Sequence, residues 1–339
     1  GANLLNGIAS IIALNSSTLS RLDFDAAIFE VDENSLPDVL DYITPNALIL
    51  LNLSRDQLDR YGEVNSIVTE WKKAISRLPQ SVSLIVNGDD PGLLEIGDGH
   101  KGTLYFSVES ENLKKKDLTH DVDFIYCPRC QTKLNFTQIA YSHIGKYKCP
   151  KCGFSNPKSK VYKNIFFPLL GTYNIYNTNA VLLTLEHLFN LESHTVSLQL
   201  KTFKPAFGRQ EVIEYMNRKI MVLLSKNPTG FNRSLDIVNE YDQTKKTVLI
   251  VLNDRIPDGR DISWIWDVDF EDLKVENIII SGDRTYDMAL RIQYASQNQN
   301  SNLKTQIQDS KLKNTEIIIN KSSITIQENL SAAINTLIE

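Results

Sequence analysis

All four cysteines of this 339-residue chain belong to one pattern. Cys127 and Cys130 form a C-x-x-C pair, eighteen residues follow, and Cys149 and Cys152 form a second pair. Two such pairs at this separation are typical of a zinc ribbon, because each short turn directs two thiolates at one point. Two disulfides in a secreted protein are the alternative, but the sequence shows no signal peptide that would favour it. Four thiolates leave no open position for water or substrate, so we expect the zinc to be structural rather than catalytic.

The remaining composition is that of an ordinary globular protein. A chain of 339 residues is long enough for two domains, each with its own core. No apolar stretch approaches membrane-spanning length. The net charge of −5 argues against a surface that binds nucleic acid as a whole. Because the first residue is Gly1 rather than Met, we expect N-terminal residues to be missing.

The first half of the chain alternates short apolar runs with an amphipathic stretch. Residues 26–31, 47–53 and 83–87 are predicted to be buried strands, and residues 64–78 a helix that stops before Pro79. Strands that alternate with helices predict an α/β fold with a parallel sheet covered on both faces.

Three polar, acid-rich loops follow these strands, at residues 30–33, 52–59 and 87–91. Ligands of parallel sheets bind beyond the carboxyl ends of the strands, so the loops together indicate a site for a cation and a nucleotide. The alternative is that Asp, Asn and Gly are simply good residues for ending strands.

The ribbon is expected to occupy about residues 121–163. Residues 124–164 contain eight Lys or Arg side chains and several aromatics but no acid. Such a mixture can bind single-stranded nucleic acid. It can also offset the net charge of about −2 on a Zn²⁺ ion with four thiolates and supply a small aromatic core, and we favour this second interpretation.

A second α/β pattern follows a predicted helix at residues 177–191. Its strands are predicted at residues 220–225, 247–252, 277–281 and 317–320. Between them, residues 253–269 hold five aspartates together with Trp264 and Trp266. This loop is either a solvated connector with the tryptophans packed beneath it or an interface with another chain.

Several motifs resemble those of the Mur ligases, the ATP-dependent amide-bond ligases of peptidoglycan synthesis. They are residues 52–62 (NLSRDQLDRYG), residues 87–91 (NGDDP), the Gly-x-Tyr-Asn-x-Tyr-Asn run of residues 171–177, and residues 207–211 (FGRQE). The inserted zinc ribbon, with residues 225–230 (SKNPTG) and 258–264 (DGRDISW), narrows the resemblance to the MurT family, ligase-like subunits of lipid II isoglutaminyl synthase.

The chain departs from the Mur ligase pattern in two places. No phosphate-binding loop of the Gly-x-x-Gly-Lys-Thr kind occurs, so we expect a fragment that does not hydrolyse ATP alone. Gln57 stands where many Mur ligases have a metal-binding histidine, a change that MurT-like proteins share.

The resemblance implies a defined reaction. ATP would phosphorylate the α-carboxyl of D-glutamate in the lipid II stem peptide, and ammonia would displace the phosphate. A separate glutaminase chain of the GatD kind would supply the ammonia, forming a heterodimer with this chain in the cytoplasm, at the inner face of the membrane. Residues 1–205 would form the ATP-binding domain with its ribbon insert, and residues 206–339 the domain that docks the glutaminase.

The resemblance also implies residue roles. Asp261 would complete the catalytic triad of the glutaminase by orienting its histidine, with Asp258 as the competing candidate. Glu30, or alternatively Glu33, would hold Mg²⁺ near the γ-phosphate of ATP. Asn174, Asn177 and Arg209 would contact the nucleotide. A Mur-type ligase that adds an amino acid and a non-catalytic, nucleic-acid-binding zinc ribbon are the alternative functions.

Overall fold

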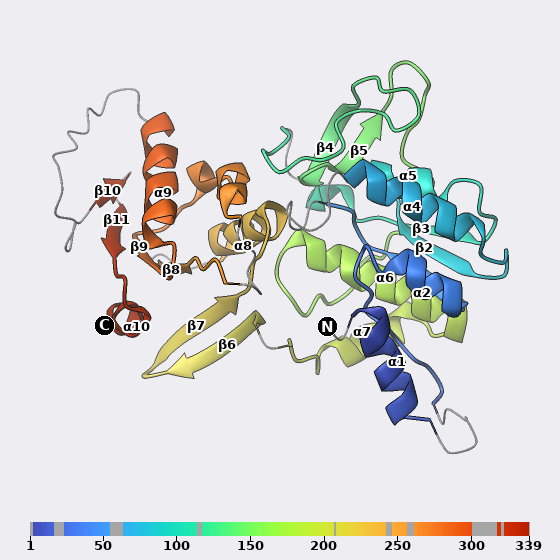
Figure 1. The fold of residues 1–339 in the computed structure, drawn as a ribbon, viewed down its shortest axis with the longest axis horizontal. Coiled ribbons are helices and arrows are strands. Elements are labelled where there is room, and N and C mark those ends of the chain that lie inside the picture. The colour runs from blue at the N-terminus through green and yellow to red at the C-terminus, as the bar shows by residue number, and fades with distance from the viewer. Residues whose placement is uncertain are drawn as a thin grey trace.

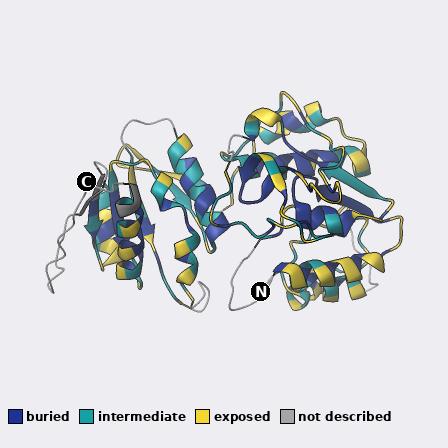
Figure 2. Ribbon diagram, turned by 90° about the horizontal axis from the view of Figure 1, so that it is seen from above, coloured by how far each residue is buried: buried dark blue, intermediate teal, exposed yellow. Residues whose placement is uncertain are grey.

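The computed structural model describes residues 3–16, 24–54, 64–113, 117–206, 208–241, 246–255, 261–299, 317–319 and 322–338. The described residues form two lobes, each built around its own sheet, with the cysteine-containing hairpin on the outside of the N-terminal lobe (Figure 1). Buried residues concentrate inside each lobe (Figure 2). The expected α/β class with parallel sheets is therefore confirmed.

The N-terminal lobe contains a parallel sheet in the order β1-β2-β3, formed by Ala47–Leu50, Ser83–Asn87 and Thr103–Phe106. All five residues of β2 are buried, as expected for a central strand covered on both faces. Leu84 and Val86 belong to one apolar cluster and Ile85 to another, so the two-residue period of the strand divides the core between its faces.

Helices cover both faces of this sheet. The first cluster includes residues of α2 (Leu36–Tyr42), α4 (Val64–Ser76) and α5 (Pro91–Gly97), and the second includes residues of α6 (Thr172–Phe189). The predicted strand at residues 83–87 and the helix before Pro79 are confirmed. The described part of the lobe also contains two further helices, α1 (Leu5–Leu14) and α7 (Ser193–Leu200), and the single turn η1 (Ser110–Asn112).

The predicted buried strand at residues 26–31 is wrong. The segment forms no strand, and Ile28 is 93% exposed. Among the described residues β1 is the edge of its sheet and pairs only with β2. An apolar run with strand propensity can pair only if a neighbouring strand is available, and its burial also depends on that neighbour. The apolar run alone therefore does not predict a buried strand.

Helix α6 begins five residues earlier than its predicted start at Asn177. Gly171 precedes it with φ of 87°, a backbone conformation that glycine adopts without steric cost. Asn174 and Asn177 therefore lie in the first two turns of the helix, not in a loop before it.

The C-terminal lobe contains a sheet in the order β10-β11-β9-β8, in which only β10 is antiparallel. The predicted strands at residues 247–252, 277–281 and 317–320 correspond to three of these strands, and that at residues 220–225 to β7 of a separate hairpin. The elements are β6 (Arg209–Tyr215), β7 (Arg218–Leu223), α8 (Pro228–Glu240), β8 (Thr247–Val251), η2 (Ser263–Asp267), η3 (Phe270–Asp272), β9 (Asn277–Ser281), α9 (Thr285–Gln299), β10 (Ile317–Ile319), β11 (Ser322–Ile326) and α10 (Leu330–Ile338).

The hairpin of β6 and β7 joins the two lobes (Figure 1). Its tip, Met216 and Asn217, has positive φ at both residues, which matches the twist of a tight hairpin turn. None of the helices in the described part of the chain is both long enough and apolar enough to cross a membrane.

Candidate functional site

The four cysteine side chains converge on one point at the end of the β4–β5 hairpin, Asn135–Tyr141 and Ile144–Lys148. Their Sγ atoms all lie within 4.8 Å of one another, with 3.5 Å between Cys127 and Cys152 and 3.4 Å between Cys130 and Cys149. A disulfide requires about 2.05 Å, whereas tetrahedral zinc–sulfur bonds of about 2.3 Å place sulfurs roughly 3.8 Å apart. The donor set and its spacing therefore fit a zinc ion.

Backbone hydrogen bonds shape the two cysteine turns. The Gln131 amide donates to the Cys127 carbonyl at 2.9 Å, and the Gly153 amide donates to the Cys149 carbonyl at 3.1 Å. Both donors have positive φ, which reverses the chain directly after each pair. In the absence of metal, burial raises the pKa of the Cys127 thiol to about 12, so zinc binding there has to displace a proton.

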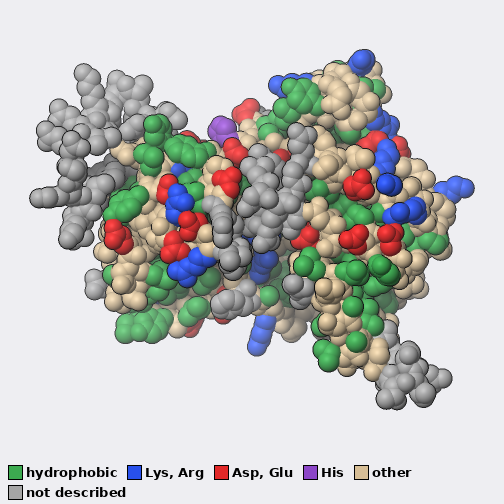
Figure 3. Space-filling model, in the orientation of Figure 1, with side chains coloured by type: hydrophobic (Ala, Val, Ile, Leu, Met, Phe, Trp, Pro, Cys, Tyr) green, Lys and Arg blue, Asp and Glu red, His purple; other side chains and the backbone are tan. Residues whose placement is uncertain are grey.

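Four of the eight basic side chains of the ribbon pair with acids of the N-terminal lobe. Arg129 contacts Glu95 at 3.0 Å and Asp98 at 2.5 Å, while also lying over the Phe154 ring. Three lysines make further ion pairs: Lys146 with Asp89, Lys160 with Glu186 and Lys163 with Glu109. Figure 3 shows basic and acidic side chains interspersed, without a continuous basic stripe on this face. Arg129 and these three lysines thus hold the ribbon against the N-terminal lobe, and this pairing argues against nucleic-acid binding.

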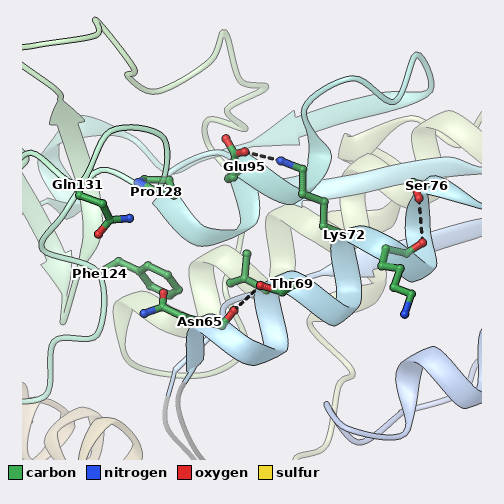
Figure 4. A pocket seen from close by; sticks show the side chains of 10 residues that line it. Asn65, Thr69, Lys72, Ser76, Glu95, Phe124, Pro128 and Gln131 are labelled. Atoms are coloured by element: carbon green, nitrogen blue, oxygen red, sulfur yellow. Dashed lines mark hydrogen bonds and ion pairs between the residues drawn. The ribbon is translucent and has the colours of Figure 1, made fainter.

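An open hollow of about 590 Å³ lies beside the ribbon (Figure 4). Its lining comes from α4, from Glu95 on α5, and from Phe124, Pro128 and Gln131 around the first cysteine turn. Two of the lining side chains, Lys72 and Glu95, form an ion pair at 2.5 Å (Figure 4). None of the nucleotide-site residues expected from the sequence lines this hollow, so we do not assign it to ATP.

The acidic loop after β2 is tied into the protein rather than open to a ligand. Asp90 accepts hydrogen bonds from the amides of Gly92 and Leu93 as the N-cap of α5, and from the Leu53 amide at 2.9 Å. Asp89 is fully buried. Both carboxylates were expected near a cation, and in the described structure protein donors satisfy them instead.

Among the described residues, four side chains donate hydrogen bonds to Asp89. Lys146 Nζ and Asn156 Nδ2 donate to its Oδ1 atom at 2.6 and 3.0 Å. Ser107 Oγ and Tyr176 OH donate to Oδ2 at 2.5 and 2.8 Å. The sequence does not reveal this network, because Lys146 and Asn156 lie in the ribbon, where their only signal is a general excess of basic and polar residues.

The expected nucleotide residues fall into two groups. Asn174 is buried and donates from Nδ2 to the Leu170 carbonyl at 2.6 Å, and Asn177 lies one turn further along α6. Gln210, next to Arg209, exchanges hydrogen bonds with the backbone of Leu170, which brings the start of β6 to the start of α6. Glu30 forms the second group: it is exposed, and within the described residues no hydrogen bond or ion pair joins it to Asn174, Asn177 or Arg209.

Comparison with known proteins decides the family. Residues 8–185 match the family model of the Mur ligase middle domain, and residues 224–338 match that of the MurT ligase C-terminal domain. The chain is 32% identical to the MurT subunit of lipid II isoglutaminyl synthase (glutamine-hydrolyzing) from Staphylococcus aureus strain COL, over 87% of this chain and 70% of that protein. The chain belongs to the MurT family. The MurT subunit of Streptococcus pneumoniae strain ATCC BAA-255 / R6 is 28% identical over 86% of this chain and 69% of its own length.

Solved structures support the Mur ligase-like fold of this MurT-family chain. A pseudomurein peptide ligase type C from Methanothermus fervidus matches with a TM-score of 0.58 at 20% identity, over 90% of this chain and 56% of the ligase. MurF from Acinetobacter baumannii matches with a TM-score of 0.56 at 14% identity, over 94% of this chain and 59% of the enzyme. The chain thus spans little more than half the length of these ligases.

Asp261 of this MurT-family chain lies at the entry to η2. It is exposed, and its Oδ1 atom accepts a hydrogen bond from the Ser263 amide at 2.8 Å. This hydrogen bond lowers the pKa of the carboxyl, which keeps it ionised near neutral pH. Asp258 and Gln57 lie outside the described residues.

The two tryptophans beside Asp261 differ in exposure. Trp264 packs against Phe231 with a ring separation of 6.0 Å. Trp266 is 47% exposed and meets Tyr294 of α9 edge-on at 5.4 Å. The loop therefore has one tryptophan packed toward the core and one available at the surface.

The N-terminal lobe and the ribbon contact the C-terminal lobe through polar groups. His120 Nδ1 lies 2.5 Å from Asp269 Oδ1, and Asn232 donates to the other oxygen of Asp269 at 2.9 Å. Arg233 of α8 is buried, with its guanidinium 4.8 Å from the centre of the Tyr141 ring of β4. The base of the ribbon thus packs directly against the lobe that carries Asp261.

Proposed function

We propose that this MurT-family chain is the ligase-like subunit of a glutamine-dependent amidotransferase that converts the D-glutamate α-carboxyl of lipid II to a carboxamide. One observation carries the proposal: a Mur ligase middle domain and a MurT C-terminal domain match the same chain in that order. Mur-type ligases use ATP and Mg²⁺ to activate a carboxylate, and the relatives are named as subunits of a glutamine-hydrolysing synthase.

The proposed reaction has two steps. The substrate carboxylate attacks the γ-phosphate of ATP and gives an acyl phosphate and ADP. Ammonia then attacks the acyl carbon, a proton is lost, and phosphate leaves with the electrons of the former acyl–oxygen bond. A partner chain of the GatD glutaminase kind would release the ammonia, and the reaction would take place at the membrane face that carries lipid II.

Residues 1–205 are proposed as the ATP-binding part and residues 206–339 as the part that docks the glutaminase. Separate apolar clusters in the two lobes support this division. Within the first part, Asn174 and Asn177 lie one turn apart on α6. The hydrogen bond from Gln210 to the Leu170 carbonyl brings the neighbouring Arg209 to the start of the same helix. Glu30 stays a candidate for Mg²⁺ only by resemblance, with Glu33 as its alternative.

Reconstitution tests the proposal. The full-length protein and its glutaminase partner would be incubated with lipid II, ATP, Mg²⁺ and glutamine, and the stem peptide would be examined by mass spectrometry. We expect conversion of one carboxyl to a carboxamide that requires both chains and ATP. Incorporation of an added amino acid instead would overturn the proposal in favour of an ordinary Mur-type ligase.

Two variants separate the proposed roles. Glu30→Gln should abolish ATP-dependent amidation and leave glutamine hydrolysis largely intact, with Glu33→Gln as the comparison. Asp261→Asn should instead lower glutamine hydrolysis strongly, because the histidine of the partner would lose its orienting anion. Asp272→Asn, an exposed carboxylate of the same region, is the matched control.

A further inference from the structure

The ribbon contacts the N-terminal lobe at the place where β2 ends and α6 begins. We propose that the ribbon is a positioning element for the start of α6, acting through Lys146 and Asn156 on the buried carboxylate of Asp89. The inference rests on the proposed function in one respect, because it treats the start of α6 as part of the nucleotide site. It goes beyond the proposed function by giving the ribbon a role in positioning that site.

The partners of Asp89 divide by their origin. Its Oδ1 atom receives Lys146 and Asn156, both from the ribbon, and its Oδ2 atom receives Tyr176 of α6 and Ser107, which follows β3. A single carboxylate therefore connects the ribbon with the helix. Because Asp89 is completely buried, it needs both a counter-charge and a full set of donors, and Lys146 is the cation that contacts it.

Backbone and packing contacts reinforce this connection. The Gly145 amide donates to the Asp89 carbonyl at 2.9 Å, and Asn156 Nδ2 also lies 3.1 Å from the Gly88 carbonyl and 2.8 Å from that of Gly145. A Cβ atom at Gly88 would lie 2.3 Å from Ser159 Oγ. The ribbon and the loop after β2 are thus in direct contact without intervening space.

The second cysteine turn lies between the two ribbon donors. Lys146 lies on β5, which leads into Cys149, and Asn156 follows Cys152. The Cys149 amide donates to the Phe154 carbonyl at 2.7 Å, and the Tyr147 amide donates to Asn156 Oδ1 at 2.8 Å. Closure of this turn fixes the spacing between Lys146 and Asn156. A zinc ion on the four cysteines would hold the turn closed, so loss of the ion should weaken the contacts of Lys146 and Asn156 with Asp89.

The consequence for α6 follows from the position of Tyr176. This residue lies between Asn174 and Asn177, and its ring is fully buried against Tyr141 of β4 with a ring separation of 5.9 Å. The ribbon therefore contacts Tyr176 twice, through Asp89 at the hydroxyl and through Tyr141 at the ring. Release of these contacts should loosen the first turns of α6, where the two asparagines lie.

Hydrogen exchange measured by mass spectrometry on the zinc-loaded, full-length protein tests the coupling directly. Lys146→Met should speed amide exchange in residues 87–91 and 172–178, and Lys146→Arg should restore most of the protection. Lys148→Met, two residues along the same strand at an exposed position, is the matched control and should change neither segment. Equal exchange in Lys146→Met and Lys148→Met would overturn the inference.

A double-mutant cycle guards against a general loss of folding. Tyr176→Phe removes only the hydroxyl that reaches Asp89, and the free energy of unfolding would be measured for Lys146→Met, Tyr176→Phe and the double variant. Coupled residues give non-additive losses, whereas purely additive losses would contradict a connection through Asp89.

Kinetics of the reconstituted pair complete the test. Lys146→Met should raise the KM for ATP by about tenfold, which corresponds to about 1.4 kcal/mol, and leave the glutamine hydrolysis of the partner unchanged. If the exchange effect is present but the wild-type pair forms no amide, the proposed function fails and the coupling stands. If the wild-type pair is active and the exchange effect is absent, the coupling fails and the proposed function stands.

Discussion

At the scale of single residues, the four cysteines are the part of the site that the sequence predicts best. We expect one zinc ion per chain, because the four cysteines form no disulfide and their donor set and spacing fit tetrahedral zinc. Metal analysis of the purified protein measures this, and Cys149→Ser should lose the metal and unfold the ribbon. A metal content near zero with four freely titrating thiols would contradict it.

Zinc retention should also depend on pH. The thiols must lose their protons to bind metal, and burial raises the pKa of free Cys127 to about 12. The apparent zinc affinity should therefore fall as the pH is lowered, in a competition titration with a chelator of known proton affinity. An affinity independent of pH between about 5 and 8 would argue against thiolate ligation.

Asp90 provides a prediction on stability. Asp90→Ala removes the N-cap of α5 and leaves the Leu53 amide without its acceptor. Loss of a cap costs about 1 kcal/mol and an unsatisfied buried donor about 1–3 kcal/mol, so we expect a loss of about 2–4 kcal/mol in the free energy of unfolding. Denaturant titration measures it, with the exposed first-turn Asp38→Ala of α2 as a control that should change stability by less than about 1 kcal/mol.

The same residue shows where sequence reasoning stops. A strand that ends in Asn-Gly-Asp-Asp suggests ligands for a cation, because the residue types and their place in a parallel sheet are both suitable. The sequence cannot show that Leu53, Lys146, Asn156 and Tyr176 already occupy these two carboxylates. Those donors come from positions up to 87 residues away, and only the folded chain brings them together.

At the scale of elements, the prediction was best where one pattern was sufficient. The apolar period and Pro79 defined α4, and a fully apolar run defined β2. Residues 26–31 had the same kind of run but joined no sheet. The start of α6 was misplaced because Gly171, which opens it at positive φ, has no apolar periodicity to mark it.

The β4–β5 hairpin leads to a prediction about close packing. A Cβ atom at Gly145 would lie 2.2 Å from the Gln138 carbonyl oxygen and 2.9 Å from the Ile139 Cα atom across the hairpin. Gly145→Ala should push the strands apart, with a cost of about 1–3 kcal/mol or more, and should weaken zinc retention. Gly99→Ala is the control, since that position has φ of 89° but nothing within 4 Å, so only backbone strain of about 1–2 kcal/mol is added.

At the scale of the whole molecule, the contact of His120 with Asp269 predicts a pH dependence. The hydrogen bond with Asp269 raises the pKa of His120, although burial opposes the shift. The stabilisation is therefore fully present below the unfolded pKa of about 6.5 and is lost as the pH rises through the folded value. At low pH the Asp269 carboxylate becomes protonated and no longer attracts the imidazolium, and burial brings this about at a higher pH because it raises the pKa of Asp269.

Thermal unfolding of His120→Gln measures this effect. The difference in Tm from the wild type should be largest near pH 6 and should disappear toward pH 9, with a modest size because His120 is largely exposed. His194→Gln, an exposed histidine of α7, is the control. An equal difference in Tm at both pH values would show that the charge of His120 is not involved. Neither this contact nor that of Arg233 with Tyr141 was visible in the sequence, since each joins residues of different lobes.

The short spacing of the cysteines in the sequence has a consequence for folding during synthesis. Cys127 and Cys152 are only 25 residues apart, and the hairpin between them pairs neighbouring segments. Tyr176, which the ribbon later contacts, is made after all four cysteines. Because domains form in the order of synthesis, we expect a ribosome-bound chain to capture zinc before α6 has emerged. Nascent chains arrested so that residues 1–163 have left the ribosomal exit tunnel while α6 is still inside it would show this as protection of the cysteines from alkylation in the presence of zinc, and full reactivity at that stage would rule it out.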